Sequence, residues 1–245
     1  MPSINTNYGA AVALQSLNKT SQQLDTTQNR ISTGMKVSSA KDNGAIFAIA
    51  TSQRANAASQ DAVRAGLQRT QSITDVALAA GDSVTSALEE MKSLAVNIAS
   101  STGSAQTAYL ADYNALGLEV ASAISGATFD GVNSLTALGS NAAITAVNTG
   151  SVTAANATAA NVDAAISATT SALATLGTQY KSLGRQITFV NKLQDALEAG
   201  VGNLVDADLA KESAKLTALQ TKQQLGVQAL SIANQGSSIL LGLFR

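Results

Sequence analysis

Cysteine, histidine and tryptophan are absent from the 245-residue sequence, and proline occurs once, as Pro2. Without cysteine the chain forms no disulfide and holds no thiolate metal site. Without histidine it has no Ser-His or Cys-His pair and no usual zinc site. The carboxylate pairs Glu89/Glu90 and Asp206/Asp208 lie in helical or helix-flanking sequence with no second group nearby. We therefore predict a protein that is not an enzyme and has no catalytic residue, metal site or cofactor.

Charged and aromatic residues are also scarce, at 13% and 3% of the sequence. A typical soluble domain carries about 25% charged residues. The net charge of −1 gives no reason to expect nucleic acid or a membrane surface as a partner. No apolar run approaches the roughly 20 residues that span a bilayer, and residues 1–17 lack the pattern of a secretory signal peptide. A surface with so little charge is either covered by polar Ser, Thr, Asn and Gln or buried in an assembly, and we expect both.

Apolar residues recur at alternating spacings of three and four, which places them on one stripe of a helix. The first long stripe continues without a slip from Ile46 to Ile98, about 80 Å of helix. A second runs from Val162 to Leu204, and a shorter one from Leu110 to Ile124. The terminal stripes comprise Ala10, Leu14, Leu17, Ser21, Leu24, Gln28 and Ile31, and, less regularly, Leu209, Leu216, Leu219, Val227 and Leu230. The polar members Gln53, Asn56 and Gln60 either fix the register within one molecule or face a neighbouring subunit.

These stripes predict a mainly α fold, an elongated rod of long antiparallel coiled-coil-like helices with a small β-hairpin segment. Asp130-Gly131 is a turn signal, and the predicted hairpin pairs Ala143–Val147 with Val152–Ala154 around residues 148–151. Gly34 can end the first helix, and Ser38 or Ser39 can cap the next. The predicted divisions are an N-terminal helix (1–33), a connector (34–44), two halves of a helical core (45–133 and 162–205), an exposed loop or hairpin (134–161) and a C-terminal helix (206–245).

Three motifs resemble those of bacterial flagellins, in the right order and over nearly the whole chain. The first is LDTTQNRISTGMKVSSAKDNGAIFAIA at residues 24–50, which departs from many members at Asn43-Gly44. The second is ATFDGVN at 127–133, where the family usually has Asn at the Asp130 position. The third joins Asp206-Ala-Asp208 and Leu216-Thr217 to Ala233-Asn-Gln235 and the ending LLGLFR at 240–245. With so few residues between its two halves, the chain resembles a minimal flagellin that has little or no outer domain.

The resemblance implies a secreted structural subunit that polymerises into the extracellular flagellar filament for swimming motility. It implies that residues 1–33 and 206–245 pair as an antiparallel coiled coil in the inner tube of the filament. The implied partners are further copies of the chain, sibling flagellins, the flagellar export apparatus and its chaperone, and the hook-associated and cap proteins. Three alternatives stay open: a hook–filament junction or other axial flagellar protein, a carbohydrate-binding flagellin relative, and an intracellular coiled-coil scaffold.

Two sets of residues are candidates for function. The terminal stripes lack partners in an isolated chain, so we expect a polymerisation interface at Leu14, Leu17, Leu24, Ile31, Leu216, Leu230, Leu240, Leu243, Phe244 and Arg245. The nearly uncharged segment between the core halves is either a flexible loop or a solvent-facing surface open to O-glycosylation. The hydroxyls available for glycosylation are those of Ser134, Thr136, Ser140, Thr149, Ser151, Thr153 and Thr158.

Overall fold

The structure is a computed structural model that describes residues 7–243, with side chains described as far as residue 235. Its helices are α1 (Tyr8–Thr33), α2 (Gly44–Ser100), α3 (Ser104–Gly126), α4 (Thr136–Gly139), α5 (Ala142–Thr145), α6 (Ala159–Val205) and α7 (Leu209–Leu243). Two short strands, β1 (Thr128–Phe129) and β2 (Val132–Asn133), form an antiparallel sheet. The predicted mainly α fold with a small antiparallel hairpin is confirmed.

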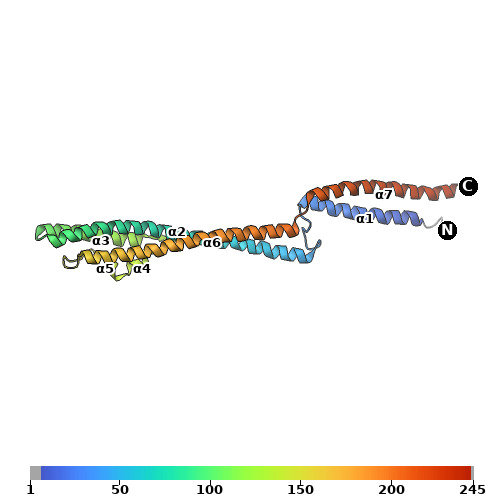
Figure 1. The fold of residues 1–245 in the computed structure, drawn as a ribbon. Coiled ribbons are helices and arrows are strands. Elements are labelled where there is room, and N and C mark those ends of the chain that lie inside the picture. Colours follow the sequence, from blue (N-terminus) through green and yellow to red (C-terminus); the bar gives the residue numbers. More distant parts are fainter. Residues whose placement is uncertain (1–6, 244–245) are drawn as a thin grey trace. The chain divides into compact units, whose positions relative to one another are not determined.

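The chain forms two compact units, and Figure 1 shows their helices. Unit 1 consists of residues up to 58 together with those from 195 onward, so it contains α1, α7 and the ends of α2 and α6. Unit 2 consists of residues 59–194 and contains the remainder of α2 and α6 with α3, α4, α5 and the sheet. Each unit is described separately below.

Local capping sets the ends of the first two helices. The Asn7 side chain accepts a hydrogen bond from the backbone N–H of Ala10, 3.0 Å away, and Gly34 ends α1 at φ 70°. A glycine without a Cβ adopts this left-handed conformation at little cost, as predicted for Gly34. The prediction that Ser38 or Ser39 caps α2 is wrong. The Asn43 side chain accepts the Ile46 N–H at 3.1 Å instead, because the helix begins at Gly44 and Asn43 is the residue before it.

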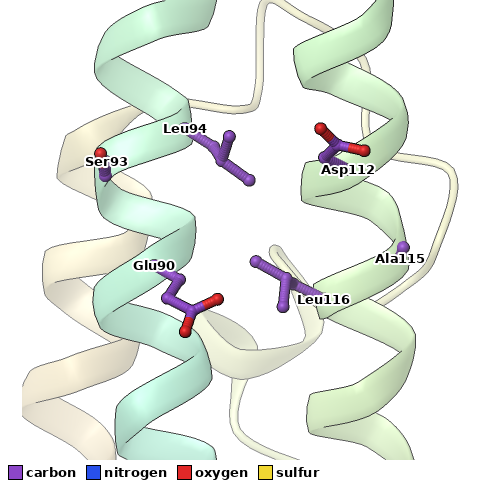
Figure 2. A pocket seen from close by; sticks show the side chains of 6 residues that line it. All are labelled: Glu90, Ser93, Leu94, Asp112, Ala115 and Leu116. Atoms are coloured by element: carbon purple, nitrogen blue, oxygen red, sulfur yellow. The ribbon is translucent and has the colours of Figure 1, made fainter.

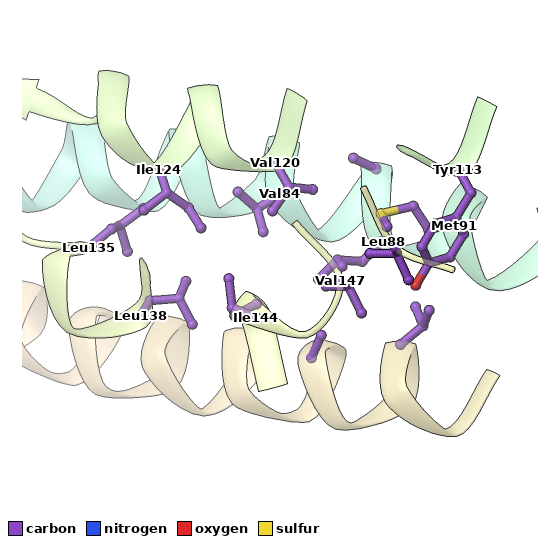
Figure 3. Close-up of a cluster of buried hydrophobic side chains, with 14 of the residues drawn as sticks. Val84, Leu88, Met91, Tyr113, Val120, Ile124, Leu135, Leu138, Ile144 and Val147 are labelled. Atoms are coloured by element: carbon purple, nitrogen blue, oxygen red, sulfur yellow. The ribbon is translucent and has the colours of Figure 1, made fainter. Parts of the chain in front are cut away.

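The core of unit 2 lies where α2, α3 and α6 pack together (Figure 3). The predicted stripes account for much of it. In α2 every stripe position from Thr74 to Ile98 is buried, and in α3 so are the positions from Tyr113 to Ile124. In the first half of α2 the predicted stripe is half-buried at Gln53, Gln60 and Leu67, but it is wrong at two apolar positions. There Ile49 and Val63 are 50% and 47% exposed, whereas Ala50 and Ala57 are buried.

Two glycines allow close approach within this core. A Cβ on Gly81 of α2 would overlap a terminal carbon of Leu173 in α6, so the leucine occupies the space that a larger residue would take. A Cβ on Gly117 of α3 would lie 2.6 Å from the Val147 carbonyl oxygen. Gly117 therefore brings α3 against the backbone of the segment that follows α5.

The hairpin forms at a different place from the one predicted. Its strands flank Asp130-Gly131, where both residues have positive φ (51° and 75°), the backbone of the tight turn that suits a two-residue hairpin. The predicted strand Ala143–Val147 is instead occupied largely by helix α5, whose Ile144 is buried together with Val147. Residues three apart on a helical turn share one face, and both of these face the core.

Much of the segment 134–161, predicted to be exposed, packs into unit 2. Its apolar side chains Leu135, Leu138, Ile144, Val147, Val152 and Ala157 are all buried. Asn114 of α3 anchors the segment, because its side chain accepts the Val152 N–H at 2.7 Å and donates to the Val152 carbonyl at 3.2 Å. The exposed part of the segment therefore consists of polar side chains and small alanines, such as Ala137, Ala146 and Ala155.

Candidate assembly surfaces

In unit 1, α1 and α7 pack as an antiparallel pair (Figure 1). The Asn7 side-chain amide donates to the Ala233 carbonyl at 2.8 Å near one end, and Arg30 pairs with Glu212 at 3.1 Å near the other. The buried and half-buried positions alternate three and four apart on both helices. Apart from the half-buried Ser21 and Arg30, which lie beside this row, they are Ala10, Ala13, Leu17, Thr20, Leu24, Thr27 and Ile31 on α1, and Glu212, Leu216, Leu219, Gln223, Gly226, Leu230 and Ala233 on α7. The contact therefore has the heptad pattern of a coiled coil.

The seam between α1 and α7 contains few bulky apolar side chains. The Thr20 hydroxyl is buried and donates to the Ser16 carbonyl at 2.9 Å. The Thr27 hydroxyl is also buried, and it has no hydrogen-bond partner among the described residues. An unpaired buried hydroxyl costs roughly 1–3 kcal/mol. The seam thus holds the two helices together with less free energy than an all-leucine seam would supply.

The predicted interface residues divide into three groups. Leu24 is buried in the seam, and Leu17, Ile31, Leu216 and Leu230 are half-buried in it. Leu14 is 49% exposed, because the seam uses Ala13 in place of Leu14. The side chains of Leu240, Leu243, Phe244 and Arg245 lie outside the described residues.

Other exposed apolar residues on these helices were missed by the sequence analysis. Tyr8 and Val12 of α1 are 82% and 48% exposed. On α7, Leu225 and Ile232 are 59% and 69% exposed. Val227, predicted to belong to the C-terminal stripe, lies outside the seam and is 54% exposed. Apolar residues that fall outside the main stripe of an amphipathic helix are the sequence signal for such a surface.

The connector between α1 and α2 is held by backbone contacts with the link between α6 and α7. Met35 and Asp206 form an isolated antiparallel bridge, and the Lys36 N–H donates to the Val205 carbonyl at 2.7 Å. Met35 also packs against a small cluster of Ala50, Val201 and Val205. The connector is therefore an ordered part of unit 1, where two segments of the same chain lie side by side.

Asp42 fixes the loop that leads into α2. One of its carboxylate oxygens accepts hydrogen bonds from the backbone N–H groups and hydroxyls of Ser38 and Ser39, at 3.0 to 3.2 Å. These bonds, the Ser39 N–H first, lower the pKa of Asp42 below its ordinary value of 3.8. The carboxylate adjoins a pocket of about 420 Å³ whose lining mixes cations such as Arg30 and Lys211 with carboxylates such as Glu212. This mixture favours no ligand of one charge.

A groove of about 510 Å³ lies between α2 and α3 in unit 2 (Figure 2). It is lined by Glu90, Ser93 and Leu94 from α2 and by Asp112, Ala115 and Leu116 from α3. We call it the acidic groove. Its two carboxylates have no ion pair among the described residues.

Two family profiles together cover almost the whole chain. The profile of the bacterial flagellin N-terminal helical region matches residues 4–140, and that of the C-terminal helical region matches residues 159–244. The chain belongs to the bacterial flagellin family. Flagellins are structural subunits of the bacterial flagellar filament, so this one is a filament subunit.

Similar proteins support the assignment, two of them over nearly their full length. The chain is 49% identical to flagellin FljK of Caulobacter vibrioides, over 99% of this chain and 98% of the relative. It is 35% identical to a flagellin of Brucella melitensis over the whole of both chains. Flagellin A of Rhizobium meliloti is 57% identical over 83 residues, which are 34% of this chain and 21% of the relative. These matches favour flagellin over the hook–filament junction alternative.

The hydroxyls predicted to be open to glycosylation differ in their exposure and in the hydrogen bonds that they make. Ser134, Thr149, Ser151 and Thr153 are exposed, and their hydroxyls make no hydrogen bond within the described residues. Thr136 and Ser140 are exposed but donate to backbone carbonyls at 2.9 and 3.1 Å. Thr158 is half-buried and accepts the Asn161 N–H at 3.3 Å at the start of α6. Within the described residues, no helix of this flagellin is both long and apolar enough to cross a membrane.

Proposed function

We propose that this flagellin polymerises into the extracellular filament by packing its α1–α7 pair against the pairs of neighbouring subunits. The observation that carries the proposal is the row of exposed apolar side chains on both helices, Leu14 at 49%, Leu225 at 59% and Ile232 at 69%. Covering each of these half-exposed side chains would contribute about 1 kcal/mol. A seam that leaves so much apolar surface uncovered is suited to further association.

Polar substitution of this surface tests the proposal. A variant with Leu225→Gln and Ile232→Gln should keep the helicity of the monomer, because neither side chain lies in the seam. Its critical concentration for polymerisation, measured by sedimentation, should rise by at least roughly tenfold, the effect of about 1.4 kcal/mol per subunit. Gln224→Ala, at an exposed polar position of the same helix, is the matched control. An unchanged critical concentration in the double variant would contradict the proposal.

The same apolar surface gives the other expected partners a reason to bind. Before polymerisation it would be covered by the export chaperone, which would deliver the chain to the export apparatus. In the filament it would contact sibling flagellins at neighbouring positions, and hook-associated and cap proteins at the two ends. A complex with the chaperone should therefore be lost in the Leu225→Gln, Ile232→Gln variant and kept in Gln224→Ala, as measured by co-purification.

We also propose that sugars attached to this flagellin are concentrated on a subset of the predicted hydroxyls. Ser134, Thr149, Ser151 and Thr153 combine exposure with a free hydroxyl, whereas modification of Thr158 would remove the cap of α6. Peptide mass spectrometry of native filaments should locate sugar on the first four and leave Thr158 bare. An unmodified intact mass would refute the modification altogether.

A further inference from the structure

An exposed aromatic side chain lies between two cations on α6 within unit 2. Phe189 is 66% exposed, a large fraction for an aromatic residue in the middle of a long helix. Arg185 precedes it by four positions and Lys192 follows by three, so all three side chains share one face of the helix. Both cations are exposed and have no ion pair among the described residues. We call Arg185, Phe189 and Lys192 the basic ridge.

The acidic groove has the complementary arrangement. Each of its two helices presents a carboxylate, a small residue and a leucine at positions i, i+3 and i+4. Because α2 and α3 run antiparallel, each leucine lies beside the carboxylate of the other helix (Figure 2). Leu94 and Leu116 point into the space between the helices, with Glu90 and Asp112 at opposite corners. The groove is therefore apolar at its centre and negative at both ends.

The spacings of the two surfaces also agree. The cations of the basic ridge are seven residues apart, which is about 10.5 Å along a helix. Carboxylates on neighbouring helices whose axes are about 9 Å apart, offset by four residues or about 6 Å, lie roughly 11 Å apart. A phenyl ring between the leucines would thus leave each cation near one carboxylate.

We infer that the basic ridge of one subunit docks in the acidic groove of a second copy, with Phe189 between Leu94 and Leu116. Arg185 and Lys192 then pair with Glu90 and Asp112. The inference rests on the proposed polymerisation and identifies one contact that it uses. The ridge lies on α6 and the groove lies between α2 and α3, so a subunit can bind one copy through its ridge and another through its groove. A heterologous contact of this kind can extend into an open polymer.

Charge exchange tests the contact. Glu90→Lys with Asp112→Lys reverses the groove, and Arg185→Glu with Lys192→Glu reverses the ridge. All four positions are exposed, so circular dichroism should show normally folded monomers. Each double variant should have a critical concentration at least roughly tenfold above the unsubstituted protein, because like charges meet. The quadruple variant, in which the signs match again, should return to within about threefold. Asp75→Lys, at an exposed position of α2 fifteen residues before Glu90, is the control and should assemble normally.

The outcomes separate this inference from the proposed function. If the double variants assemble like the unsubstituted protein, or if the quadruple variant stays defective, the pairing is wrong while polymerisation stands. If the unsubstituted protein does not assemble, both are wrong. Phe189→Ala gives an independent measurement, since loss of an aromatic anchor should also raise the critical concentration roughly tenfold or more. An unchanged value in Phe189→Ala would overturn the role of the ring.

Discussion

Replacing Gly117 by alanine tests whether α3 and the segment after α5 pack as closely as the structure shows. The new Cβ would lie 2.6 Å from the Val147 carbonyl oxygen and 3.3 Å from the Asn148 Cα. Both are backbone atoms, and the Asn148 N–H is bonded to the Ile144 carbonyl at 3.0 Å. Relief of the overlap therefore requires the anchored segment to move. Overpacking of this kind costs roughly 2 kcal/mol, whereas alanine gains about 1 kcal/mol over glycine within a helix. The expected net loss is about 1 kcal/mol of unfolding free energy.

Urea unfolding of the monomer, followed by circular dichroism, measures this loss. Gly177→Ala is the matched control, because Gly177 lies inside α6 and a Cβ there would meet nothing within 4 Å. The control should gain up to about 1 kcal/mol from helix propensity alone. If Gly117→Ala stabilises the protein as much as Gly177→Ala does, the close contact between α3 and the segment is refuted.

Four further results are expected. Tyr113→Phe should keep the unfolding free energy or raise it by up to about 1 kcal/mol, because burial raises the pKa of Tyr113 to about 12 and its hydroxyl has no hydrogen-bond partner in the part of the chain that the structure describes; a large loss would reveal a missed hydrogen bond. Thr27→Val should raise the melting temperature of the α1–α7 pair, since it removes another unpaired hydroxyl; a lower value would contradict the seam. The carboxyl of Asp42 should titrate below 3.8 by NMR. Because its pKa is lowered on folding, its stabilising contribution is present above about pH 3.8 and lost as the pH falls through the folded value; an unshifted midpoint would show that the serine bonds do not form. A short polar insertion after Asn148 should leave filament assembly intact, because both flanks are anchored and lengthening a loop costs little; loss of filaments would place the loop in an interface.

The sequence predicted the helices well wherever only one stripe was apolar. In α6 the positions Val162, Thr169, Leu176, Val190 and Val201 are all buried at the predicted spacing. The first half of α2 carries apolar residues on two adjacent stripes. The sequence prediction took the stripe with the larger residues Ile49 and Val63 as the buried stripe, and this choice was wrong at these two positions. Burial follows Ala50 and Ala57, and Ala50 packs with Val201 and Val205. That partner could not be known from the sequence of α2 alone.

The position of the hairpin could not be predicted from the sequence for a different reason. A run as short as Ala143–Val147 fits a strand or one turn of helix equally, and its periodicity cannot decide between them. A helical turn forms because it places Ile144 and Val147 on one face, where the core buries both side chains. The Asp130-Gly131 turn was visible in the sequence, but its flanking strands are only two residues each. The acidic groove was invisible for a related reason. Its two patterns, each a carboxylate, a small residue and a leucine within five positions, form a groove only when α2 and α3 pack side by side.

The contrast between the two units explains how folding and assembly can be separate properties of one chain. Among the described residues of unit 1, the buried apolar side chains are Leu24, Val37, Ala50, Ala57, Val201, Val205 and Leu219. Unit 2 has a continuous core that includes Leu88, Met91, Ile98, Tyr113 and Ile144, all almost fully buried. Because buried apolar area supplies most folding free energy, unit 2 can fold on its own contacts. Unit 1 combines threonines in its seam with exposed leucine and isoleucine. In the proposed assembly it would gain from neighbouring subunits the apolar packing that it lacks within the monomer. Changes in the unit 2 core should therefore alter the unfolding of the monomer, and changes on the outer face of α7 should alter the critical concentration.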